Sequence, residues 1–271
     1  MLALVLTVAA PDTELASDDL WALGVVAIEE RPGPSADTAE LWTSLGDDSA
    51  AVIQALENVA HRWAWRLETI DDAVMDTWRD YAIPTWIADD LVVYPAWLAP
   101  PVGSNLIAIG IEPGATFGMG DHPTTVLSLL ALRGAIFPGA KVLDVGCGSG
   151  VLAIGACLFG AHHADAIDIS PAAVPVTIAN ATRNNVGDRV NVTTTALSEI
   201  SARYDIVLAN ILAPTLIELA VDLKRVLSES GTLVISGILA DRNDHVLEAL
   251  TPLRVTDRHD QGMWTAITLR W

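Results

Sequence analysis

Three glycines at alternate positions, Gly146, Gly148 and Gly150, lie between two apolar segments of the chain. Residues 141–145 indicate a buried strand, and residues 151–160 indicate a helix that ends at a glycine. Glycine has no Cβ, so a ligand can approach the backbone of such a turn closely. The order strand, glycine turn, helix is typical of the first unit of a nucleotide-binding α/β sheet. The alternative is a tight turn that binds nothing, although one glycine would suffice for that.

Two residues argue against a dinucleotide as the ligand. The dinucleotide fingerprint has its third glycine one place later, where this chain has Val151. Asp144, just before the turn, would repel a pyrophosphate but would attract an ammonium group. S-adenosylmethionine (SAM) carries an amine and a sulfonium and has no phosphate. We therefore expect Asp144, Gly146 and Gly148 to contact SAM.

Two further polar residues stand at the ends of predicted strands. Asp168 ends a strand over 164–168, and about 20 residues after the first glycine a carboxylate can bind the ribose hydroxyls of an adenosine. An exposed aspartate without a ligand is the alternative. Asn210 follows a strand over 204–208, and ligands of open parallel sheets bind at the carboxyl ends of the strands. We expect Asn210 to bind in the cofactor cleft and to act in catalysis by holding an amine.

A second glycine-rich loop, residues 112–122, runs into a helix predicted over 123–133. Because anions favour helix N-termini, we expect Thr124 and Thr125 to offer their hydroxyls to the carboxylate of the ligand. A helix cap without a ligand is the alternative. His122 could suggest a metal or a base, but no other His, Cys or carboxylate stands at ligand spacing, so we predict no metal site.

The composition indicates a soluble globular protein of one or two domains, with 51% hydrophobic and 18% charged residues among 271. Residues 2–8 are apolar but follow no basic segment, so they predict a strand and not a signal peptide. No run approaches the roughly 20 apolar residues of a membrane span. Cys147 and Cys157 have neither a disulfide nor a zinc spacing. We therefore expect a cytoplasmic protein without membrane contact.

The net charge of −19 is concentrated in the front part of the chain. Residues 1–110 contain 18 acidic residues and only four arginines, with no lysine. Such a surface would repel phosphates, so we expect no direct binding of nucleic acid. A basic partner is compatible with this charge. Mere solubility is an alternative interpretation of the same excess.

The order of predicted elements indicates two domains joined by a linker. Residues 1–70 show the order strand-helix-strand-strand-helix-strand, which is typical of a small ferredoxin-like α+β domain. Residues 71–112 are predicted to form a linker. Residues 113–271 alternate strands and helices and end in two strands that form an antiparallel pair. The predicted fold class is therefore α/β, with a Rossmann-like seven-stranded sheet preceded by the ferredoxin-like domain.

From Ile111 onward the chain resembles the bacterial ribosomal protein L11 methyltransferases, the PrmA family. Met119, Asp121 and the pair Pro214-Thr215 depart from the pattern usual in that family. The segments that carry the resemblance are F-G-x-G-x-H-P-T-T at 117–125, D-V-G-C-G-S-G at 144–150, I-D at 167–168, A-N-I-L-A at 209–213 and S-G-I-L at 236–239.

The resemblance implies a SAM-dependent protein methyltransferase that modifies lysine amines and an N-terminal amine. In the family, Thr125, Gly146, Asp168 and Asn210 would bind SAM. The small front domain would bind the basic protein substrate, a large-subunit ribosomal protein. The alternatives are a SAM-dependent N-methyltransferase that acts on another protein, a small molecule or a nucleobase, and a SAM-binding regulator without catalysis. A nicotinamide oxidoreductase ranks third, because Val151 and Asp144 disfavour it.

Overall fold

The structure is a computed structural model that divides the chain into two compact units, Met1–Ala82 and Ile83–Trp271. Each unit contains its own hydrophobic core. The residues that the structure describes are 2–23, 25, 28–43, 49–56, 62–69, 82–112 and 120–271.

In the described residues, the first unit contains a four-stranded antiparallel sheet, in the order β2-β3-β1-β4, and the helices α1 and α2. Alternate residues of β1, such as Leu4 and Leu6, face a core that also contains Leu20 of α1 and Leu56 of α2. This is the predicted order of strands and helices. The elements are β1 (Leu2–Ala9), a 3₁₀ turn (Ala10–Asp12), α1 (Thr13–Ala22), β2 (Glu29–Pro32), β3 (Thr38–Thr43), α2 (Ser49–Leu56) and β4 (Ala64–Thr69).

The second unit begins with a small sheet of three strands, β5 (Thr85–Ala88), β6 (Leu91–Pro95) and β7 (Ile107–Ile111). The inner side chains of β6 and β7 are fully buried in the core of this unit. Residues 83–112, which the sequence places in a linker, therefore belong to the second unit, because their apolar strands need a surface to cover them. Residues 70–81 lie outside the described residues.

The main sheet of the second unit has seven strands in the order β10-β9-β8-β11-β12-β14-β13. The first five in this order are parallel to one another, and β14 is antiparallel to both of its neighbours. The strands are β8 (Lys141–Val145), β9 (His163–Ile167), β10 (Val190–Thr193), β11 (Tyr204–Asn210), β12 (Leu227–Leu239), β13 (Arg254–Gln261) and β14 (Trp264–Arg270).

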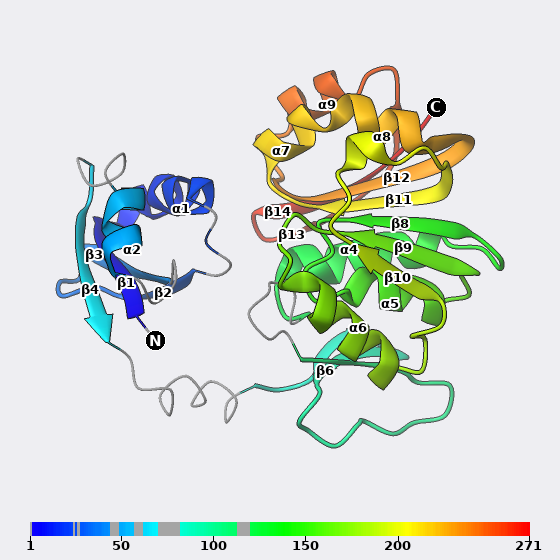
Figure 1. Cartoon of the computed structure of the whole chain (residues 1–271), viewed down its shortest axis with the longest axis horizontal. Helices are drawn as coiled ribbons and strands as arrows, with labels where there is room; N and C mark the ends of the chain where they lie inside the picture. Colours follow the sequence, from blue (N-terminus) through cyan, green and yellow to red (C-terminus); the bar gives the residue numbers. More distant parts are fainter. Residues whose placement is uncertain are drawn as a thin grey trace. The chain divides into compact units, whose positions relative to one another are not determined.

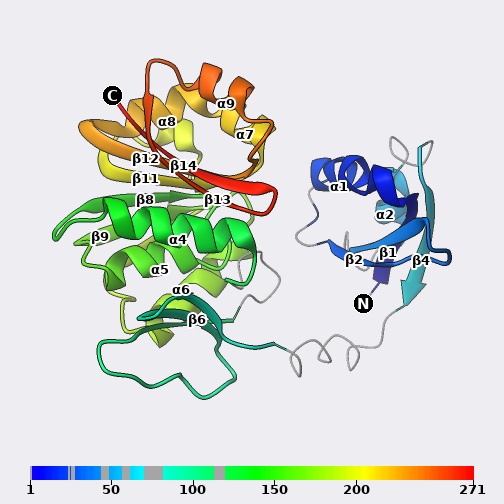
Figure 2. The ribbon, with the colours of Figure 1, turned by 180° about the vertical axis from the view of Figure 1, so that it is seen from behind.

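Helices cover both faces of this sheet (Figures 1 and 2). The successive strand residues Val142 and Leu143 accordingly pack into two different cores, which explains why the strands are almost continuously apolar. Within the described ranges, no helix is long and apolar enough to cross a membrane. One face carries α4 (Pro123–Ala135), α5 (Val151–Leu158) and α6 (Ala173–Arg183), and the other carries α7 (Ala213–Glu218), α8 (Ala220–Val226) and α9 (Asp244–Ala249).

The strand order reverses beside β8. From β8 the chain proceeds to β9 and β10 on one side, and then returns to β11 and β12 on the other side. Loops after β8 and β11 therefore diverge, and in sheets of this kind the ligand crevice is expected at the carboxyl ends of these two strands. The fold places the predicted ligand site at this edge.

Candidate functional site

The carboxyl ends of three adjacent parallel strands bring the predicted site residues together. The last aligned residues of β8, β9 and β11 are Val145, Ile167 and Ala209. Because neighbouring strands lie about 4.8 Å apart, residues that follow this row span roughly 10 Å of one edge. The residues that follow are Gly146, Asp168 and Asn210.

The glycine turn between β8 and α5 needs glycine at both ends. Gly146 has a φ of +74°, and a Cβ there would lie 2.5 Å from Cγ2 of Ile211. Gly150 caps α5 with a φ of +81°, and its Cβ would lie 2.7 Å from Thr177. A left-handed backbone costs other residues about 1–2 kcal/mol each. The turn thus presents bare backbone at the crevice.

Asp168 is bound to this turn. Its Oδ2 accepts the Gly148 N–H (2.8 Å), and its Oδ1 accepts the Ser170 N–H (2.9 Å). These two bonds fix the carboxyl group beside the middle of the glycine turn. Since a carboxylate offers about four lone-pair sites, each oxygen can accept a further hydrogen bond. Asp168 can therefore bind a pair of adjacent hydroxyls without losing its own supports.

Asp144 lies beneath α5, and it is only 1% exposed. Gly150 has no side chain to cap the helix, and Asp144 Oδ2 instead accepts the Ala153 N–H in the first turn (3.1 Å). Among the described residues, Asp144 Oδ1 has no hydrogen-bond partner. Burial raises the pKa of Asp144 to about 7; the charge of Asp168 adds to the rise, and the Ala153 N–H opposes it.

We expect Asp144→Asn to change how the stability of the free protein depends on pH. Folding raises the pKa of Asp144 from 3.8 to about 7, so the stability associated with its protonated form is complete below about pH 4 and is lost as pH rises through about 7. The full loss corresponds to about 4 kcal/mol. Asparagine stays neutral, so thermal unfolding at pH 8 should show the variant to be more stable than the wild type.

The same comparison at pH 4 should show little difference between Asp144→Asn and the wild type. Asp205→Asn is the matched control, because Asp205 also accepts a backbone N–H, from Lys141 (2.9 Å), but is half-exposed at the opposite edge of the sheet. An equal effect of Asp144→Asn at pH 4 and pH 8 would show that the buried carboxyl group does not titrate in this range.

We expect Gly146→Ala to destabilise the chain more than Gly139→Ala does. Gly139 also has a positive φ, of +86°, but a Cβ there would meet nothing within 4 Å. Both variants bear the backbone cost of about 1–2 kcal/mol, whereas Gly146→Ala also forces a shift of Ile211, which adds about 1–3 kcal/mol. Differential scanning calorimetry measures this difference. Equal losses would mean that Ile211 moves freely and that the turn is not tightly packed.

The two threonines at the start of α4, Thr124 and Thr125, have different surroundings. His122 is the N-cap, and its Nδ1 accepts the Thr124 N–H (3.3 Å) and lies 2.8 Å from Thr124 Oγ1. Burial lowers the pKa of His122, and the opposing charge of Asp121 is the weaker influence. Thr124 is thus part of the cap. Thr125 Oγ1 is buried and has no hydrogen-bond partner within the described ranges, so Thr125 is the better candidate for ligand binding.

The helix start lies at the same edge of the sheet as the glycine turn. The rings of His122 and Trp264 meet edge to face, with centroids 5.1 Å apart. Trp264 pairs with Leu239 at the carboxyl end of β12, just beyond the pairing of Ser236 with Asn210. The structure therefore brings the predicted threonines to the crevice edge, on the far side of β11 from Asp168.

Sequence inspection missed Asn180, which is fully buried in α6. Its amide group donates to the main-chain oxygens of Glu112 and Ser149 and so touches both glycine-rich loops. The available signal was a pair of polar residues, Thr177 and Asn180, on the side of a predicted helix that faces the core. Buried polar side chains are normally hydrogen-bonded, so such a pair points to a specific contact.

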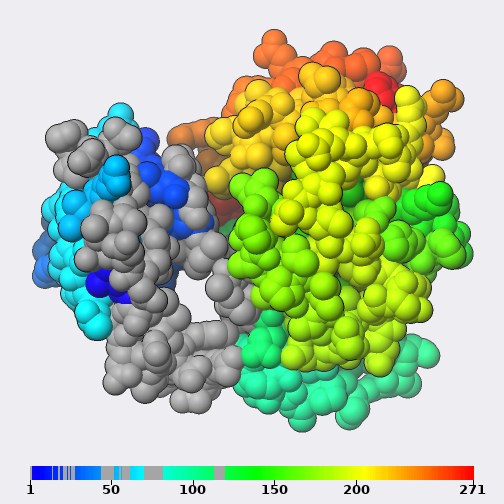
Figure 3. Space-filling view, in the orientation of Figure 1, coloured from blue at the N-terminus to red at the C-terminus, as the bar shows by residue number. Residues whose placement is uncertain are grey.

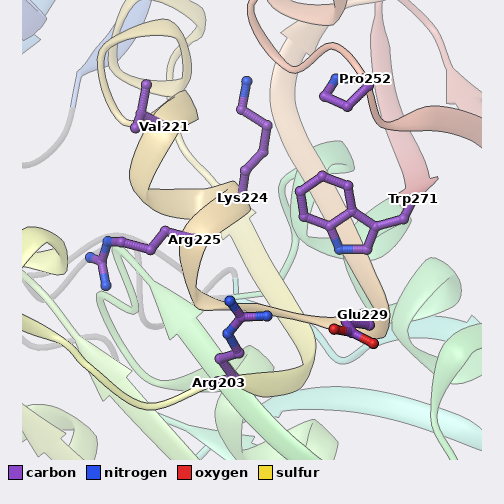
Figure 4. Close-up of a pocket in the computed structure, with 7 residues that line it drawn as sticks. All are labelled: Arg203, Val221, Lys224, Arg225, Glu229, Pro252 and Trp271. Carbon is purple, nitrogen blue, oxygen red and sulfur yellow. The ribbon is translucent and has the colours of Figure 1, made fainter.

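A pocket of about 670 Å³ lies at the opposite, amino edge of the sheet. Figure 4 shows Lys224 and Arg225 leaving α8 in different directions. Lys224 donates to two carbonyls at the end of α9, each at 2.8 Å, and Arg225 donates to carbonyls around the 3₁₀ turn Leu197–Glu199. Lys224 and Arg225 are therefore hydrogen-bonded to carbonyl groups at the ends of other helical segments and are not placed to bind a ligand. The pocket is lined by Arg203, Val221, Lys224, Arg225, Glu229, Pro252 and Trp271.

Metal ligands are not grouped in the part of the chain that the structure describes. No cluster of three or more His, Cys, Asp or Glu side chains there could hold a metal ion. The described polar groups at the crevice instead suit an organic ligand with hydroxyl and charged groups.

Comparisons with known proteins place this arrangement in a family. The family described as Ribosomal protein L11 methyltransferase (PrmA) matches residues 33–271. A ribosomal protein L11 methyltransferase of Geotalea daltonii is 39% identical over 72% of this chain, and the match spans 66% of that relative's length. One of Desulfotalea psychrophila is 32% identical over 91% of this chain and 83% of its own.

A crystal structure of a ribosomal protein L11 methylase from Lactobacillus delbrueckii subsp. bulgaricus has the same fold. It superposes with a TM-score of 0.65 at 30% identity, over 69% of this chain and 97% of the other. This likeness confirms the predicted α/β methyltransferase fold. The chain belongs to the ribosomal protein L11 methyltransferase (PrmA) family.

Proposed function

We propose that the protein transfers methyl groups from SAM to lysine and N-terminal amines of ribosomal protein L11. The observation that carries this proposal is the row at the carboxyl edge of the sheet, where Gly146, Asp168 and Asn210 follow the last aligned residues of three adjacent strands. Membership of the family supports the reaction and its substrate. The alternatives are methylation of another amine and binding of SAM without catalysis.

The residues at the crevice fit SAM on two observations. The turn at Gly146 leaves no room for a Cβ and exposes its backbone. Among the described residues, three buried side-chain oxygens have no partner, and two of them, Asp144 Oδ1 and Thr125 Oγ1, belong to the predicted site residues; buried polar atoms rarely remain so. We assign Asp168 to the ribose hydroxyls of SAM and Thr125 to the carboxylate of its methionine part. We assign Asp144 to the positive charge of the same methionine part.

The role of this chain in the reaction is to position an amine. When bound, SAM supplies an electrophilic methyl group on a positively charged sulfur. Asn210 orients the lone pair of the amine toward the crevice, and its side-chain oxygen accepts an amine N–H. Free lysine has a pKa of about 10.4, which removal from water and a nearby positive charge both lower. Water takes the proton, and correct placement supplies most of the rate enhancement.

The two units have different roles in this proposal. The front unit has the strand order of a ferredoxin-like domain, and we assign it to recognition of the basic substrate, since the front part of the chain carries most of the negative charge. The second unit is the Rossmann-like methyltransferase domain. A ribosomal substrate places the protein in the cytoplasm.

Incubation of the protein with radiolabelled SAM and a ribosomal extract tests the function directly. We expect one dominant labelled protein, identified as L11, with methyl groups on lysine and N-terminal amines by mass spectrometry. Label on a different protein or on a small molecule would show that L11 is not the substrate. Binding of SAM without any methyl transfer would favour the alternative that the protein is a SAM-binding regulator without catalysis.

A further inference from the structure

One buried side chain joins the two glycine-rich loops of the second unit. Asn180 Nδ2 donates to Glu112 O (2.9 Å) and to Ser149 O (3.0 Å). Its Oδ1 accepts the Glu112 N–H (3.0 Å) and an Arg183 N–H (2.7 Å). The helix that carries it exposes its other side, where Ile178 is 53% exposed, whereas Asn180 is fully buried. In Figure 3 the yellow-green surface includes the outer side of α6.

The contact with Ser149 is one of a pair that orients the glycine turn. Thr177, one helical turn before Asn180, donates to Gly148 O (3.1 Å). Two successive carbonyl oxygens of the turn are therefore held against α6 by two side chains, each fully buried. A carbonyl oxygen turned toward the ligand would repel the carboxylate of SAM. The two side chains thus fix the direction of peptide groups that the ligand must approach.

A second asparagine, Asn184 at the C-cap of α6, makes similar hydrogen bonds without touching the glycine turn. Asn184 Oδ1 accepts the Gly110 N–H (2.9 Å), and its Nδ2 donates to Gly110 O (2.7 Å). The same Nδ2 also donates to Asn180 O (2.8 Å). Both asparagines therefore attach α6 to β7 or to the residue after it, and each bonds both backbone groups of one residue there. Of these two asparagines, only Asn180 reaches the glycine turn. A comparison of the two therefore distinguishes an effect on helix attachment from an effect on the ligand site.

We propose that Asn180 is a positioning residue for the cofactor site, which holds Glu112 and Ser149 in one hydrogen-bonded unit and keeps the glycine turn in the shape that binds SAM. This inference rests on the proposed function. Loss of the side chain removes the hydrogen bonds that Asn180 makes with the Glu112 N–H, with Glu112 O and with Ser149 O. Lost hydrogen bonds at buried positions are costly, so we expect the turn to shift.

The test compares matched substitutions at the two asparagines in the full chain. Asn180→Ala and Asn184→Ala each remove one hydrogen-bonded side-chain amide, fully buried at Asn180 and half-buried at Asn184, and Asn180→Asp and Asn184→Asp each exchange the donors for acceptors while keeping the shape. Thermal unfolding, the Kd for SAM by calorimetry, and the KM for SAM and kcat with L11 are measured for all four. The aspartate pair decides the result if the alanine variants do not fold.

We expect both Asn180 variants to raise the Kd and KM for SAM by about tenfold or more, with kcat at saturating SAM changed by less than about threefold. The Asn184 variants should lose similar thermal stability and bind SAM within about twofold of the wild type. Equal effects at both positions would overturn the inference, as would Asn180 variants that bind SAM normally. A wild-type protein that does not bind SAM would instead overturn the proposed function and this inference with it.

Discussion

Asp168→Ala is expected to weaken SAM binding by a hundredfold or more. The variant loses both carboxylate oxygens that are assigned to the ribose hydroxyls. Each hydrogen bond to a charged group is worth about 1.5–3 kcal/mol. Since about 1.4 kcal/mol corresponds to a tenfold change in Kd, two lost bonds account for at least about a hundredfold. The variant also frees the Gly148 N–H, which Asp168 holds at 2.8 Å, so the turn itself loses a support. Isothermal titration with SAM measures the effect.

Asp205→Ala is the matched control for this result. Asp205 likewise accepts a backbone N–H (2.9 Å), from Lys141, but it stands at the amino end of β11, away from the crevice. We expect its SAM affinity to stay within about twofold of the wild type. If Asp168→Ala bound SAM as tightly as this control, the carboxyl group would serve only the turn and the assignment to the ribose would be wrong.

Asn210→Ala is expected to lower kcat about a hundredfold while the Kd for SAM changes by less than about tenfold. A poorly placed nucleophile costs about this much in rate, and the lost side chain is assigned to the amine and not mainly to the cofactor. Methylation of purified L11 under single-turnover conditions separates the transfer step from product release. The pairing of Asn210 with Ser236 on β12 is through the backbone, so it persists in the variant.

Asn191→Ala provides the comparison for Asn210→Ala. Asn191 lies on β10 and donates to Asp165 Oδ1 (3.0 Å), an exposed contact outside the crevice. We expect wild-type turnover from it. Wild-type turnover from Asn210→Ala as well would remove Asn210 from the catalytic machinery and leave the orientation of the amine to other groups.

Local patterns were sufficient to predict the main sheet and the edge at which the candidate site residues come together. A strand followed by glycines at 146, 148 and 150 has few alternatives, because positive φ values and close packing exclude other residues. Asp168 and Asn210 were placed by the rule that parallel strands present their carboxyl ends at one edge. The register of β8, β9 and β11 confirms that these strand ends are neighbours.

Long-range contacts limited what could be predicted. Residues 83–112 look like a linker because their strands are short and interrupted by proline, and only the core of the second unit shows where they belong. Asn180 was missed because its partners, Glu112 and Ser149, lie far from it along the chain. The capping of α5 by Asp144 could not be predicted either, because it depends on a helix that begins at a glycine.

Calorimetric titration of the full wild-type chain with SAM, and with NADH in parallel, tests the central claim most directly. We predict saturable binding of one SAM per chain at neutral pH under reducing conditions, and no detectable heat with NADH. Heat with NADH but none with SAM would show that the crevice beside β8 serves a different ligand, and the methyltransferase account of this site would be contradicted.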